Sequence, residues 1–168
     1  VYYFDFANNS FSETIVNNSD VDVEIDSIGQ HVAKTLTLSL PQDIQIGKGN
    51  GIHAKINVES DVTRNCGILL VAYYRLQSEE YASRHILGSG YNSGNSLLSL
   101  IADTTLSADT QLYFSSLNNL LTLNKNDQLE LEISFVTDTS TSGTIKLIAN
   151  NTYNGMAFLD KLTYVEYI

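Results

Sequence analysis

Residues 81–95, YASRHILGSGYNSGN, bring aromatic, cationic and amide side chains together within one short segment. Side chains of these types bind sugars, because a pyranose ring has apolar C–H faces and a rim of hydroxyl groups. The alternative is that the tyrosines and asparagines only cap strands and form turns. The candidate ligand-binding residues are Tyr81 and Tyr91 as stacking platforms and Arg84, His85, Asn92 and Asn95 as polar contacts.

A second segment, NNTYNG at residues 150–155, repeats the combination of tyrosine with amide side chains. The chain has ten tyrosines and no tryptophan, so most of its aromatic rings carry a polar group. The turn-forming alternative applies to this segment as well. The residues of this second candidate patch are Asn151, Tyr153 and Asn154.

The histidines give little support for catalysis. His31 and His53 alternate with apolar residues, which places them on the polar faces of their strands, and no GxSxG nucleophile motif is present. A glycosidase would need two carboxyl groups facing each other across a cleft, and such a pair cannot be read from one sequence. We therefore expect a protein that is not an enzyme, with a hydrolase as the least favoured alternative.

Neither a metal nor a cofactor is expected. The acidic run DVDVEID at residues 20–26 resembles the start of an EF-hand loop, but Ile25 stands where that loop requires glycine. On a strand, carboxylates at alternate positions lie about 6.6 Å apart in a row, too far apart to surround one ion. A solvated acidic strand face is the simpler interpretation. The sequence has no His/Cys cluster for zinc and no phosphate-binding glycine motif.

The charge and composition of the chain limit the classes of partner that it is expected to bind. The net charge of −10 disfavours nucleic acids and anionic membrane surfaces, and no apolar run is long enough to span a bilayer. The single cysteine, Cys66, lies in the apolar run CGILLVAYY, so we interpret it as a buried hydrophobic residue and expect no intrachain disulfide.

Hydrophobic residues alternate with polar ones along most of the chain, as in half-buried β-strands. The clearest examples are DVDVEID, KTLTLSLP, GIHAKINVES and LELEISF, and in the last of these Glu130 and Glu132 are expected to face out. CGILLVAYY is apolar on both faces, which predicts a central strand. The pattern predicts an all-β fold: an antiparallel β-sandwich of jelly-roll type in a single domain, residues 1–168.

Helical signal is scarce, and we expect at most one or two short helices. Ser78 to Ile86 could form two helical turns, with Ser78 as the N-cap and glutamates near the positive end of the helix dipole. A Gly-Ser-Asn loop is expected to follow this helix. TDTSTSGT, residues 137–144, is polar and predicts an exposed hairpin loop.

The segment LNNLLTLNKNDQLELEISF resembles the Leu-x-Leu-x-Lys-x-Asp motif and alternating strand of complement-globular-head and tumour-necrosis-factor-like jelly rolls. NTYNGMAFLDKLTYVEYI is similar to the closing strands of that group, although no Phe-x-Gly stands directly before the last strand. The whole chain also looks like the jelly-roll modules of phage tails, baseplates and capsids. These resemblances imply glycan binding or virion decoration, often as trimers.

Together these observations favour a non-catalytic carbohydrate-binding or adhesion module of a phage virion structural protein or a bacterial surface protein. Its expected partner is a cell-surface glycan, and its expected location is the virion surface or the extracellular side of a cell. The alternative is a trimeric structural head or capsid decoration domain, in which tyrosines anchor the interface. The chain opens VYYFDF without methionine, so we expect a fragment of a longer polypeptide.

Overall fold

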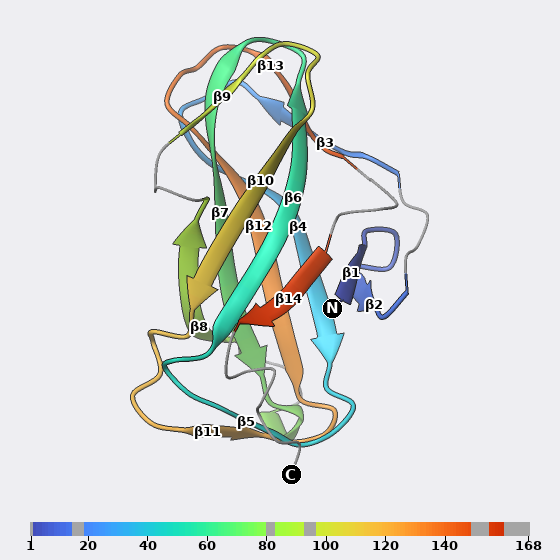
Figure 1. The fold of residues 1–168 in the computed structure, drawn as a ribbon, viewed down its shortest axis with the longest axis vertical. Helices are drawn as coiled ribbons and strands as arrows, with labels where there is room; N and C mark the ends of the chain where they lie inside the picture. The colour runs from blue at the N-terminus through green and yellow to red at the C-terminus, as the bar shows by residue number, and fades with distance from the viewer. Residues whose placement is uncertain (1, 15–18, 80–82, 93–96, 149–154, 160–168) are drawn as a thin grey trace.

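The computed structural model describes residues 2–14, 19–79, 83–92, 97–148 and 155–159, the last range by its backbone alone (Figure 1). Within these ranges the chain forms fourteen β-strands and one 3₁₀ turn. The elements are β1 (Tyr2–Asp5), β2 (Ser10–Ser12), β3 (Val21–Ile25), β4 (Gly29–Ser39), β5 (Ile44–Ile46), β6 (Gly51–Ser60), β7 (Arg64–Arg75), η1 (Gln77–Glu79), β8 (His85–Tyr91), β9 (Leu98–Leu100), β10 (Leu106–Tyr113), β11 (Leu121–Leu123), β12 (Gln128–Thr137), β13 (Gly143–Leu147) and β14 (Gly155–Leu159).

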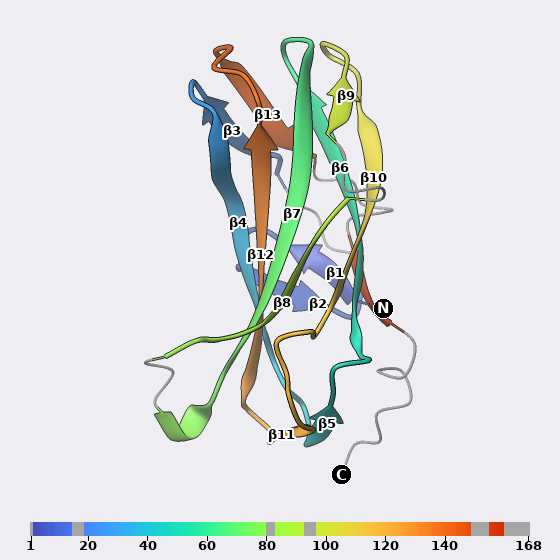
Figure 2. The same cartoon turned by 90° about the vertical axis from the view of Figure 1, so that its left-hand side faces the viewer.

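The long strands form two packed layers (Figure 2). One layer has the order β4, β12, β7, β8, and the other has β3, β13, β6, β10. All of these neighbours pair antiparallel. The all-β sandwich that the alternating pattern predicts is therefore confirmed, and η1 is its one helical element among the described residues.

Short strands close the sides and one end of the sandwich. On one side β1 pairs with β14 and with β2, and β2 meets β4 through a single parallel pair, Ser10 with Thr37. On the other side β8 runs from β7 toward β10 (Figure 2), and a bridge from Asn92 to Thr110 joins the layers. The small β5–β11 sheet covers the lower end (Figure 1).

The core lies between the layers and follows the period of two. Every second residue of a strand points to the same face, so one set of side chains is removed from water. The inward residues expected from KTLTLSLP, GIHAKINVES and LELEISF are all buried: Leu36, Leu38, Leu40, Ile52, Ala54, Ile56, Val58, Leu129, Leu131, Ile133 and Phe135. In DVDVEID, Ile25 is buried, whereas Val21 and Val23 are half-buried. The hydrophobic pattern thus fixes which face of each long strand packs inward.

The helix predicted for Ser78 to Ile86 is wrong. The 3₁₀ turn η1 ends at Glu79, residues 80–82 lie outside the described residues, and strand β8 begins at His85. The expected Gly-Ser-Asn loop is also strand up to Tyr91. This difference arises from tertiary structure. The edge of β7 offers a row of backbone hydrogen-bonding groups with which ILGSGY pairs, and the turn-like composition of ILGSGY gives no sign of this pairing.

Within the segment at residues 137–144, residues 138–142 are exposed as expected, but the segment is not a hairpin loop. Strand β12 pairs with β4 and β7, whereas β13 pairs with β3 and β6. The segment therefore connects the two layers.

In the described part of the chain, no helix has the length and apolar character needed to cross a membrane.

Cys66 is fully buried in β7, as its apolar surroundings predict. Burial raises the pKa of its thiol from 9.0 to about 12, and the charge of Arg64 offsets this only in part. We expect Ellman's reagent to leave the native protein unlabelled at pH 8 and to label one thiol per chain in guanidinium chloride. Fast labelling of the native protein would contradict this burial.

The same shift predicts how stability depends on pH. The folded state keeps its thiol proton to a higher pH than the unfolded chain. The stability that comes from burying the protonated thiol is therefore complete below pH 9 and is lost as the pH rises toward 12.

Candidate functional site

The outer surface of the β4–β12–β7–β8 layer carries a cluster of charged and aromatic side chains, here called the outer face. Its central members are Tyr73 and Arg75 of β7, Arg84 before β8, and Glu130 and Glu132 of β12. Glu130 pairs directly with Tyr73 across the β12–β7 ladder, so these two side chains project from the same side of the sheet.

The two glutamates face away from the core, as the alternating pattern predicts, but they are not solvated. They do lie opposite the inward leucines, but Glu130 is 6% exposed and Glu132 is 9% exposed. Arginine side chains cover both carboxylates. Burial of a carboxylate requires such partners, because the loss of hydration must be offset by charge and hydrogen bonds.

Arg84 holds this cluster together. Its Nη1 donates to Glu130 Oε1 at 2.9 Å and to Glu132 Oε2 at 3.2 Å. The guanidinium carbon lies 3.9 Å from the centre of the Tyr73 ring, in cation–π contact. Arg75 Nε donates to the second oxygen of Glu130 at 2.8 Å. Glu130 therefore has an arginine on each carboxylate oxygen.

Hydrogen bonding fixes the charge of Arg84. The bond to Glu130 raises the pKa of Arg84 above its ordinary value, and Glu132 and Tyr73 add to the increase. The Arg84 side chain is still 38% exposed. Both hydrogen bonds to the glutamates come from Nη1, and a guanidinium carries further N–H donors on Nε and Nη2.

The His85 side chain contacts Tyr74 and Glu79 beside the charged cluster. Its ring stacks on Tyr74 with 4.8 Å between centroids, and its Nε2 lies 2.9 Å from Glu79 Oε2. Glu79 belongs to η1, so this contact ties the turn to the start of β8. His85 is thus next to Arg84 in sequence, but its contacts with Tyr74 and Glu79 connect η1 to the start of β8.

The remaining candidates of residues 81–95 separate in space. Tyr91 ends β8, is 43% exposed and pairs with Leu69, which places it on the outer face. Asn92 is buried: its Oδ1 accepts from Ile68 N at 2.9 Å, and its own N donates to Ile68 O at 3.0 Å. The structure therefore uses Asn92 to close the sheet edge.

Several candidates lie outside the described residues. They are Tyr81, Asn95 and the whole second patch, Asn151, Tyr153 and Asn154.

Of the first segment, the structure brings Arg84 and Tyr91 to one face. Tyr73 and Arg75 join that face from the preceding strand β7, and Glu130 and Glu132 join it from β12, which is distant in the sequence.

Three exposed acidic side chains that a hydrolase could have used, Glu79, Asp103 and Asp109, are dispersed. Glu79 contacts His85, Asp109 Oδ1 lies 3.2 Å from His53 Nε2, and Asp103 sits in a turn with φ of 58°. No group of three or more His, Cys, Asp or Glu within the described residues could hold a metal ion.

Apolar side chains flank the charged cluster. Val32 is 53% exposed and Ile86 is 51% exposed. Val32 pairs with Ser134 through β4, and Ile86 pairs with Tyr73 through β8, so both stand on the outer face. The outer face therefore combines hydrogen-bonding groups with exposed apolar and aromatic surface.

Comparison with known proteins shows the fold at low sequence identity. A CocE/NonD family hydrolase from Staphylococcus aureus matches 94% of this chain with a TM-score of 0.63 and 9% identity. A selenomethionine-labelled α-amino acid ester hydrolase matches 74% of this chain with a TM-score of 0.53 and 9% identity. The match covers 35% of the first hydrolase chain and 25% of the second. The chain thus spans about a third or less of the hydrolases that it resembles, and the likeness concerns the fold alone.

A structure of the infectious bursal disease virus Gx strain matches 86% of this chain and 36% of the viral chain, with 10% identity. The TM-score of this match is 0.42. No protein-family model and no curated protein sequence matches the chain.

Proposed function

We propose that this chain is a non-catalytic carbohydrate-binding module whose ligand lies along the outer face. The observation that carries the proposal is the fixed guanidinium of Arg84, which contacts the Tyr73 ring and two buried glutamates while its side chain stays 38% exposed. A planar donor held in one orientation loses little conformational entropy when it bonds a hydroxyl group.

The spacing of the tyrosines supports an extended ligand. Tyr91 pairs with Leu69, and Ile86 pairs with Tyr73. At ~3.3 Å per residue along β7, the two tyrosine positions are about 13 Å apart. This span suits several linked sugar rings better than one. Tyr91 would supply an apolar platform at one end and Arg84 the hydrogen bonds at the other.

The charge arrangement favours binding over catalysis. A carboxyl group that acts as a general acid must reach the glycosidic oxygen with its proton. Here Glu130 and Glu132 accept hydrogen bonds from arginine instead. Since the same fold forms a third or less of two hydrolase chains, a role as one module of a larger protein is consistent with the comparisons. The parent that we propose is a virion structural protein or a bacterial surface protein.

Tyr91→Ala should weaken saccharide binding about tenfold, because an aromatic platform contributes about 1–1.5 kcal/mol beyond its buried area. The measurement is a glycan array followed by calorimetric titration of the best oligosaccharide. Tyr113→Ala is the matched control, since Tyr113 is similarly exposed but belongs to β10 of the other layer. Absence of binding at millimolar oligosaccharide, or equal affinity of Tyr91→Ala and the native protein, would reject the proposal.

A second candidate function is assembly into a trimeric structural head or capsid decoration protein. The exposed apolar side chains of Val32 and Ile86 on the outer face favour it, because exposed apolar patches often mark protein contacts. Light scattering separates the two proposals. A stable trimer that buries Tyr91 would support assembly, and a monomer at micromolar concentration would count against it.

A further inference from the structure

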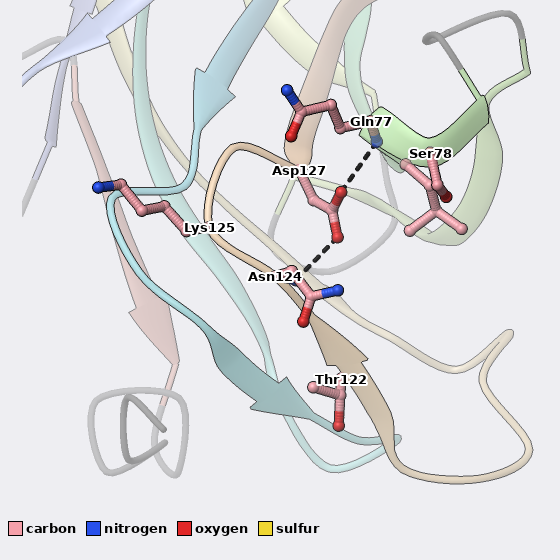
Figure 3. A pocket seen from close by; sticks show the side chains of 7 residues that line it. Gln77, Ser78, Thr122, Asn124, Lys125 and Asp127 are labelled. Atoms are coloured by element: carbon pink, nitrogen blue, oxygen red, sulfur yellow. Dashed lines mark hydrogen bonds between the residues drawn. The ribbon is translucent and has the colours of Figure 1, made fainter.

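A pocket lies where β7 ends, beneath the turn η1 (Figure 3). Its volume is about 450 Å³, within the range of small-molecule sites. Leu76, Gln77 and Ser78 form one wall, and the other is formed by Thr122, Asn124, Lys125 and Asp127. The pocket therefore begins one residue beyond Arg75 of the outer face.

Asp127 fixes both walls of this pocket. It is 4% exposed, and its Oδ1 accepts from Gln77 N at 2.9 Å while its Oδ2 accepts from Asn124 N at 2.7 Å. Figure 3 shows the carboxylate between these two residues. The turn itself is closed by a bond from Asp127 N to Asn124 O at 3.0 Å. Hydrogen bonds of Asp127 within the protein therefore hold the two walls of the pocket together without a ligand.

The chemistry of the lining selects an uncharged polar ligand. Gln77, Ser78, Thr122 and Asn124 offer neutral amide and hydroxyl groups, and the ammonium end of Lys125 points away from Asp127 in Figure 3. An anion would approach the Asp127 carboxylate and a chain with a net charge of −10. An apolar ligand would cover the amides without bonding them.

We propose that this pocket binds one neutral pyranose unit, the end residue of the glycan that lies on the outer face. The inference rests on the proposed function. Asn124 and Gln77 side chains would bond hydroxyl groups, with Thr122 adding a third polar contact. Leu76 would pack against the C–H face of the ring. Because the backbone amides already bind Asp127, side-chain changes at these positions leave the frame intact.

The test is an NMR titration of the 168-residue chain with methyl β-D-glucopyranoside and, separately, with D-glucuronate. We expect the amide signals of Gln77 and Asn124 to shift with the glucoside at millimolar concentration, and glucuronate to bind more weakly. Asn124→Leu should raise the dissociation constant about tenfold, since it removes hydrogen bonds to the ligand. Thr122→Val, which keeps shape and removes one hydroxyl, should weaken binding less.

Asn119→Leu is the matched control, because Asn119 is exposed and does not line the pocket. Equal or tighter binding of glucuronate would overturn the proposal, as would unchanged affinity of Asn124→Leu. If Tyr91→Ala abolishes oligosaccharide binding while Asn124→Leu has no effect, the outer face binds sugar and the pocket does not. If neither the pocket nor the outer face responds to any saccharide, both proposals fail.

Discussion

Arg84→Met is expected to lower the free energy of unfolding by about 2–3 kcal/mol. The change leaves Glu132 without its arginine and removes one of the two partners of Glu130. Removal of one member of a buried ion pair costs about 3–5 kcal/mol. The smaller value expected here follows from the 38% exposure of the Arg84 side chain, because water can reach the uncovered carboxylates.

A double-mutant cycle in urea separates this effect from simple loss of charge. Adding Glu132→Gln to Arg84→Met should restore part of the stability, since the uncompensated carboxylate is gone. Lys48→Met is the control for net charge, because Lys48 is exposed in the turn before β6. A cost below about 0.5 kcal/mol for Arg84→Met would mean that the cluster is solvated.

The burial of the glutamates shows where sequence reasoning reaches its limit. Alternation placed Glu130 and Glu132 on the face opposite the leucines, and this is correct. The alternating pattern cannot distinguish a strand face that is exposed to water from one that other side chains cover. The covering arginine lies 46 residues before Glu130, and the ladder that brings them together is formed only in the folded chain.

The candidate site was predictable in part for the same reason. Arg84 and Tyr91 are predicted as ligand contacts because residue types that can bind sugars gather in one segment, and the structure places both on the outer face. Tyr73 lies in the run that predicts a central strand, although an aromatic ring followed by the cation Arg75 at the end of that strand is a usable signal. Asn92 was misplaced because a buried asparagine that binds a neighbouring strand has the same local sequence as one in a loop.

Gly90→Ala should destabilise the protein by about 3 kcal/mol, the upper end of the usual cost of overpacking, and this is the second large effect that we expect. Gly90 lies on β8 opposite Leu70, where β8 passes β10. A Cβ at this position would overlap the backbone oxygen of Gln111, and one at Gly88 would overlap that of Tyr113. A backbone atom cannot rotate away as a side chain can, so the strands would have to move apart.

Thermal and urea unfolding measure the loss, and hydrogen exchange locates it. We expect faster exchange at the amides of Asn92 and Ile68, whose mutual bonds close this side of the sandwich. Gly49→Ala is the matched control, because an added Cβ there meets nothing within 4 Å. Equal stability of Gly90→Ala and the native protein would contradict the close approach of β8 and β10.

The same substitution tests how the fold supports the proposed function. Strand β8 carries Tyr91 at one end and follows Arg84 at the other, so its path past β10 sets the position of both side chains. Gly90 itself has no side chain to offer a sugar. If saccharide binding falls with Gly90→Ala under conditions where the variant stays folded, the loss must arise from the displacement of β8. The glycines that made this segment resemble a loop would then be what allows it to place the outer-face residues.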